Sequence, residues 1–231
     1  MDDEQRRQLF EDALDGYEDG PDATVRATAT ALEASESARS LVLVEGVSDQ
    51  IAVETLARRL GHDLAAEGIV VLPMGGAHGV GRYLERFGPH GADLRLAGLC
   101  DVGEEAIFRR AMKDAGIGNP TNRSEVEQFG FFVCDTDLED ELIRAATRPA
   151  IEALLDSQGD LGSFRTIQKQ PGWRDRPFPS QMCRYLSAGR RRKSRYARLI
   201  IERLDTASVP SPLQNLIAHV TETHPTEEDP P

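Results

Sequence analysis

Acidic side chains recur after the apolar runs of this sequence, and they are the residues best suited to chemistry. Glu45 directly follows the run Ser40–Val44, and Asp49 comes four residues after Glu45. Asp101 follows a third such run, and an acidic cluster at 135–141 follows a fourth. Because parallel strands end at a common edge of a sheet, we expect these carboxylates to meet there. Converging carboxylates suit a hard divalent cation such as Mg²⁺, which removes their mutual repulsion.

Each acid also has an ordinary structural explanation. Asp49 can complement the N-terminus of a helix, and the acids at 139–141 can do the same for the next predicted helix. Asp101 and Glu104 can be turn and first-turn residues. Taken one at a time, these explanations are the better ones. Acids after three of four apolar runs together favour a shared site.

A basic block at 165–203 contrasts with the acidic remainder of the chain. It holds twelve Lys or Arg and two acids, whereas residues 1–22 hold nine acids and two Arg, and the whole chain has a net charge of −12. An acidic total argues against a nucleic-acid partner, but a local basic face can still bind a polyanion. Charge alone favours a solvated basic helix that balances acidic neighbours.

The apolar runs and the segments between them predict an α/β fold. A parallel sheet of about four strands, with helices on both faces and a helical C-terminal extension, accounts for the alternation. Strands are expected at 40–44, 68–72, 94–100 and 129–134. Helices are expected at 1–20 (or a polar tail), 23–38, 49–60, 80–87, 104–115, 138–147, 149–169, 180–205 and 212–221. Gly75 and Gly76 predict a tight turn near the site.

The length of 231 residues suits one or two domains. The expected organisation is an acidic, Ala-rich helical segment at 1–39, a core at 40–148, a helical extension with the basic block at 149–222, and a disordered tail at 223–231. Three scattered cysteines suit the reducing cytoplasm. The acidic N-terminus argues against a signal peptide. The sequence has no apolar run of about 18 residues, so no membrane-spanning helix is expected.

Several short motifs, in this order, resemble a TOPRIM domain. They are Val44-Glu45-Gly46-x-x-Asp49, then Gly75-Gly76, then an apolar run ending at Asp101. The later Asp137-Leu138-Glu139 and Gly189-Arg-Arg-Arg-Lys193 are similar to an acidic motif and a C-terminal lysine of the OLD (overcoming lysogenization defect) endonucleases. The resemblance covers roughly residues 40–205 and implies a Rossmann-like TOPRIM sheet.

The resemblance implies a metal-dependent nuclease that hydrolyses phosphodiester bonds of DNA through two cations, Mg²⁺ or Mn²⁺. The implied roles are catalysis by Glu45, as a metal ligand or alternatively a general base, and by Lys193. The implied metal ligands are Glu45, Asp49, Asp101, Asp137 and Glu139. The implied phosphate-contacting residues are Arg190, Arg191, Arg192 and Arg195. Tyr196, in contrast, is expected to be structural, because it sits at helical spacing beside apolar residues.

Two departures from the family pattern stand out. Gly103 occupies the place of the second acid in Asp-x-Asp, and Glu104 is a candidate substitute. The ATPase domain that precedes the TOPRIM domain in OLD endonucleases has no counterpart in this sequence, which contains no Gly-x-x-x-x-Gly-Lys-Ser/Thr. The expected partners are therefore DNA and, where an ATPase takes part, a separate subunit. A homodimer is also compatible with the resemblance, and no membrane partner is expected.

Two other functions compete with the nuclease. A non-catalytic TOPRIM module would bind nucleic acid or a protein, with Gly103 marking a decayed metal site. A small-molecule phosphotransferase or phosphohydrolase could use a similar sheet. The long basic block favours a polymeric substrate over a small one.

Overall fold

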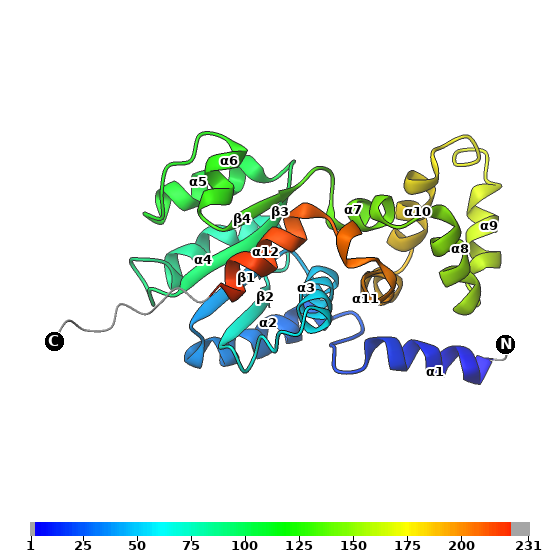
Figure 1. The fold of residues 1–231 in the computed structure, drawn as a ribbon, viewed down its shortest axis with the longest axis horizontal. Helices are drawn as coiled ribbons and strands as arrows, with labels where there is room; N and C mark the ends of the chain where they lie inside the picture. Colours follow the sequence, from blue (N-terminus) through cyan, green and yellow to red (C-terminus); the bar gives the residue numbers. More distant parts are fainter. Residues whose placement is uncertain (1–2, 223–231) are drawn as a thin grey trace.

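A four-stranded parallel sheet organises the protein (Figure 1). The computed structural model describes residues 3–222, without the side chains of Asp3 and Arg190. The strands are β1 (Ser40–Val44), β2 (Ile69–Pro73), β3 (Arg95–Asp101) and β4 (Phe131–Cys134). Their order in the sheet is β2-β1-β3-β4, and every neighbouring pair is parallel. The prediction of a four-stranded parallel α/β sheet is confirmed.

Helices account for most of the remaining chain. Along the sequence they are α1 (Asp3–Leu14), α2 (Ala23–Ala34), α3 (Val47–Arg59), α4 (Val80–Phe87), α5 (Glu105–Asp114), α6 (Arg123–Gln128), α7 (Leu138–Ala145), α8 (Arg148–Ser157), α9 (Leu161–Gln168), α10 (Phe178–Ser187), α11 (Arg190–Arg203) and α12 (Ser211–Thr221). None of the helices between residues 3 and 222 is both long and apolar enough to cross a bilayer.

Alternate residues of each strand enter two different cores, which explains why the strands read as continuous apolar runs. In β1, Leu41 and Leu43 pack with α2, α4, α5 and α6. Val42 and Val44 point the other way and pack with α3, α11 and α12. All four side chains are fully buried. The sheet therefore has a helical layer on each face, as the sequence predicts.

The C-terminal extension packs on the same core as the sheet. Figure 1 shows α12 lying along β3 and β4, and α11 beside α3, while α8, α9 and α10 gather at one end of the molecule. Leu213, Leu216 and Ile217 of α12 belong to the core that β1 shares. The segments on either side of the expected boundary at 148 therefore share one hydrophobic core. The domain boundaries expected at 39 and 148 stay predictions. The tail predicted to be disordered lies outside the described residues.

The helical predictions differ from the structure for local reasons. The helix expected at 149–169 is interrupted at Gly159, whose φ of +67° an α-helix cannot contain. The helix expected at 180–205 is interrupted between Ser187 and Arg190, where the backbone of Gly189 is extended. Helix α6 was not predicted, although Asn122 caps it by accepting a hydrogen bond from the Glu125 backbone N–H at 3.1 Å.

Candidate metal centre

Three carboxylates meet at the carboxyl edge of the sheet. Glu45 follows β1, Asp101 is the last residue of β3, and Glu104 lies immediately before α5. Each offers one oxygen, and these oxygens all lie within 4.8 Å of one another. Glu45 is exposed, whereas Asp101 and Glu104 are half-buried, so the cluster is open to solvent on one side. These three residues form what we call the acidic cluster.

The end of β2 holds Glu45 in place through its backbone. The N–H groups of Gly75 and Gly76 both donate to the Glu45 carbonyl, at 3.0 and 3.2 Å. The two glycines adopt φ values of +77° and +117°, which L-residues rarely reach. The predicted turn is therefore confirmed, and it fixes the backbone from which the Glu45 side chain extends.

The electrostatics of the acidic cluster suit a cation. Burial, and then the nearby charge of Glu45, raises the pKa of Asp101 to about 7. Burial, and then the charge of Glu45, also raises the pKa of Glu104. A divalent cation would relieve the repulsion, and an all-carboxylate oxygen donor set is the kind that Mg²⁺ and Mn²⁺ prefer. The residues present therefore fit such an ion.

A second group of predicted residues lies next to the acidic cluster, on α3, α7 and α11. The Lys193 Nζ atom pairs with Glu139 Oε1 at 2.8 Å. Burial alone would lower the pKa of Lys193, but the carboxylates of Glu139 and Asp49 outweigh it and raise that pKa. Asp49 is buried, and its Oδ2 accepts a hydrogen bond from the Gly46 N–H at 2.9 Å. Burial, and then the charge of Glu139, raises the pKa of Asp49 to about 8.

Asp137 has a capping role in addition to its place near the site. Its side chain accepts a hydrogen bond from the Asp140 N–H at 2.7 Å and so caps α7. It is also close enough to Asp101 to contribute to the raised pKa of that residue. Capping α7 is therefore a structural role that was not expected for Asp137, and it leaves the side chain close to Asp101.

Glu104 is the member of the acidic cluster that the sequence placed least firmly. It was considered only as a substitute for the acid missing at Gly103. A turn after β3 brings it back to Asp101, whose carbonyl accepts a hydrogen bond from the Glu104 N–H at 2.9 Å. The signal available in the sequence was its position three residues after Asp101, at the start of the helix predicted for 104–115.

The prediction for Arg195 is wrong. Its side chain is only 1% exposed, and its guanidinium pairs with Asp160, a residue buried with it. Tyr196 Oη also donates to Asp160 Oδ2, at 2.9 Å, which agrees with the structural role expected for that tyrosine. Phe10 of α1 covers the guanidinium at 4.1 Å from its ring centroid. Arg195 is thus part of the core and cannot reach a phosphate.

The neighbouring arginines have internal partners but are not buried. Arg191 pairs with Asp19 at 2.8 Å, and Arg192 donates to the Tyr185 carbonyl at 2.9 Å. The side chain of Arg190, also predicted to contact phosphate, lies outside the described residues. A phosphate-binding role for these three arginines therefore stays a prediction.

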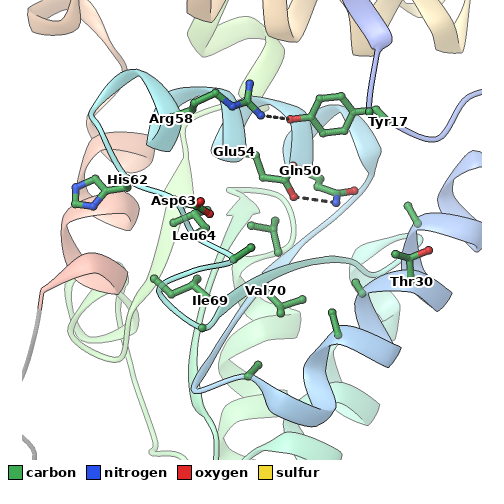
Figure 2. A pocket seen from close by; sticks show the side chains of 18 of the residues that line it. Tyr17, Thr30, Gln50, Glu54, Arg58, His62, Asp63, Leu64, Ile69 and Val70 are labelled. Atoms are coloured by element: carbon green, nitrogen blue, oxygen red, sulfur yellow. Dashed lines mark hydrogen bonds between the residues drawn. The ribbon is translucent and has the colours of Figure 1, made fainter.

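A separate pocket of about 940 Å³ lies along the free edge of β2 (Figure 2). Ile69 and Val70 form its floor, and Gln50, Glu54 and Arg58 of α3 project into it from one side. Gln50 donates to Glu54 at 3.0 Å, and Arg58 reaches the Tyr17 hydroxyl at 3.5 Å. None of the predicted site residues lines it. The pocket is therefore distinct from the acidic cluster.

Comparisons with known proteins bear on the fold and the family. Residues 38–101 match the family described as the TOPRIM domain of overcoming lysogenization defect protein-like proteins. No curated protein matches the sequence. The structure is similar to the C-terminal region of the Xanthomonas campestris pv. campestris OLD protein, with a TM-score of 0.61 and 22% identity over 79% of this chain and 94% of that one. It is similar to the C-terminal region of the Burkholderia pseudomallei OLD protein, with a TM-score of 0.61 and 19% identity over 79% of this chain and 97% of that one. Residues 38–101 thus match an OLD-like TOPRIM domain, within a fold that the chain shares with the C-terminal regions of OLD proteins.

Proposed function

We propose that this protein is a divalent-metal-dependent nuclease that hydrolyses phosphodiester bonds of DNA. The observation that carries the proposal is the acidic cluster of Glu45, Asp101 and Glu104 beside a lysine held by a buried glutamate. Cations bound there would polarise a phosphoryl oxygen and lower the pKa of an attacking water. The TOPRIM match at residues 38–101 supports a metal-binding domain of this kind.

The side chains divide into two proposed roles. Glu45, Asp101 and Glu104 would bind one cation, and Asp49, Asp137 and Glu139 would supply ligands for a second. Glu45 is also the exposed member of the acidic cluster, so it alternatively accepts a proton from water. Lys193 keeps its positive charge because neighbouring carboxylates raise its pKa, so it can stabilise the charge that develops on the leaving oxygen.

The non-catalytic TOPRIM module is the competing function. It rests on Gly103, which replaces an expected acid. Glu104 counts against it, because its carboxylate completes the acidic cluster that Gly103 would leave short. A separate ATPase subunit and a homodimer stay predictions of the resemblance, as does a cytoplasmic location.

Cleavage of supercoiled plasmid tests the proposal. The protein is incubated with Mn²⁺ or Mg²⁺ beside Glu45→Gln and Lys193→Met, and we expect metal-dependent nicking that each variant reduces by about 10²–10³-fold. Glu36→Gln and Lys113→Met are matched controls, because both residues are exposed and lie outside the site and the basic block. Absence of cleavage by the unmodified protein with either metal would favour the binding module. Cleavage that survives both site substitutions would overturn the assignment.

A further inference from the structure

A groove of about 580 Å³ runs between α2 and α4, on the face of the sheet opposite α3. The first half of α2 forms one wall and carries Val25. Met74 and Gly75, which follow β2, lie between the walls, and α4 contributes Arg82 and Arg86 to the other wall. The groove is therefore built from two parts of the sequence, α2 and residues 74–86.

Two cationic side chains in this groove have no carboxylate partner in the described part of the chain. Arg82 and Arg86 are four residues apart on α4, so they lie on the same side of the helix. Both are exposed, and neither makes an ion pair among residues 3–222. Like charges at this spacing destabilise a helix unless an anion lies between them. The groove therefore presents a local positive charge that the fold leaves unbalanced.

Aromatic rings orient the two guanidinium groups. Arg82 lies 4.6 Å from the centroid of the Tyr83 ring and donates to the Tyr83 hydroxyl at 2.8 Å. Arg86 lies 4.9 Å from the centroid of the Phe87 ring. Both rings are buried, so they restrict the arginines without neutralising them. Groups held in this way lose less conformational freedom when they bind an anion.

One lining residue of the groove is bonded to the backbone of the candidate metal centre. Gly75 lines the groove, and its N–H is one of the two that hold the Glu45 carbonyl. Thr28 of α2 also donates to the Pro73 carbonyl, which ties the α2 wall to the end of β2. The groove therefore lies next to the backbone that carries Glu45.

The groove also offers apolar surface. Val25 is 70% exposed, so the α2 wall presents an apolar side chain to solvent. A single strand exposes both its phosphates and the apolar faces of its unpaired bases, whereas a duplex hides those faces inside its base stack. A single strand, with phosphates for the arginines and a base or sugar for Val25, therefore suits this lining better than a duplex.

We propose, building on the nuclease function above, that this groove binds one DNA strand next to the phosphate to be cleaved. Arg82 and Arg86 contact its phosphates, and Val25 contacts a base or sugar. Arg82 and Arg86 would then make phosphate contacts of the kind that the resemblance implied for Arg195.

Fluorescence anisotropy with a labelled single-stranded 20-mer in EDTA separates this proposal from catalysis, since cleavage requires the metal. For Arg82→Gln/Arg86→Gln we expect binding at least about tenfold weaker, and a slope of log K against log salt that falls by about 1.4, or 0.7 for each lost phosphate contact. Arg110→Gln/Lys113→Gln is the control, because it removes the same charge from exposed positions of α5 that lie outside both the groove and the basic block. Circular dichroism checks that each variant is folded.

The outcomes distinguish a failure of the groove proposal from a failure of the nuclease proposal. A loss confined to Arg82→Gln/Arg86→Gln supports the groove, even when no cleavage of any substrate is detected. Equal affinity of all variants, an equal loss in the control, or no binding by the unmodified protein overturns it. A duplex of the same sequence that binds more tightly, with the same dependence on Arg82 and Arg86, would overturn the assignment to a single strand.

Discussion

The acidic cluster and the start of α11 are both dense in charge, but the fold treats them in opposite ways. At the carboxyl edge of the sheet, the oxygens of three carboxylates lie within 4.8 Å of one another, and none of the three makes an ion pair within residues 3–222. Along α11, the charges find partners inside the protein: Lys193 pairs with Glu139, Arg191 with Asp19 and Arg195 with Asp160. The two regions therefore differ in whether the fold itself supplies a partner for each charge.

The largest expected effect is the loss of unfolding free energy when Arg195, the buried arginine of α11, is replaced. Arg195→Met leaves Asp160 buried without its cation, and the loss of a buried partner costs about 3–5 kcal/mol of unfolding free energy. Urea denaturation followed by circular dichroism measures it. The double variant Arg195→Met/Asp160→Leu should regain part of the loss, since no charge is then left unpaired. A single-variant loss below about 1 kcal/mol would mean that Arg195 is not part of the core.

A smaller effect is expected in the acidic cluster. Glu104→Gln removes one of three carboxylates, and we expect Mn²⁺ affinity to fall by about 10–100-fold, as for other residues that tune a metal site. Isothermal titration calorimetry measures the affinity, with Glu36→Gln as the matched control. Unchanged affinity would show that Glu104 does not substitute for the acid missing at Gly103.

The pH dependence of stability probes the same cluster without metal. A carboxyl whose pKa is raised on folding, as that of Asp101 is from 3.8 to about 7, binds more protons in the folded state than in the unfolded state. Its contribution to stability is therefore greatest below about pH 4 and is lost as the pH rises toward 7. In EDTA at pH 7.5, Asp101→Asn should raise the melting temperature by about 2–4 °C, with solvent screening limiting the gain.

The control for this measurement is the same variant at pH 4. There Asp101 is protonated in the folded state, so the amide should give no advantage and the two melting temperatures should converge. Divalent cation should reverse the order at pH 7.5, because only the carboxylate binds it. An advantage of Asp101→Asn that is equal at both pH values would contradict the electrostatic explanation.

The smallest effect is expected at the exposed end of α11. Arg191 pairs with Asp19, but its side chain is 60% exposed, so the pair is screened by water. Arg191→Gln should change the unfolding free energy by less than about 0.5 kcal/mol in the same urea experiment. A loss approaching that of Arg195→Met would mean that exposure does not separate these two arginines.

The sequence by itself determined the sheet, its helical layers and the chemistry at its edge. Strands such as Ser40–Val44 are almost wholly apolar because both faces of the sheet are covered. Glu45 follows β1 and Asp101 ends β3, and because these strands are parallel neighbours both acids lie at the same edge of the sheet. These features are local or follow from strand direction, so the residue order was sufficient to predict them.

Only the tertiary structure decided which charges are available. Arg195 and Arg191 are four residues apart in one basic run, yet Arg195 is buried against Asp160 and Arg191 is exposed. Both lie on the same side of α11, but Arg191 is in its first turn, whereas Arg195 lies one turn further along, where the helix enters the core. Arg82 and Arg86 were not predicted to bind an anion, because they do not belong to a run of basic residues in the sequence. Their groove exists because the fold brings α2 and α4 to opposite sides of the chain that follows β2, and such long-range placement depends on which surfaces meet rather than on local residue order.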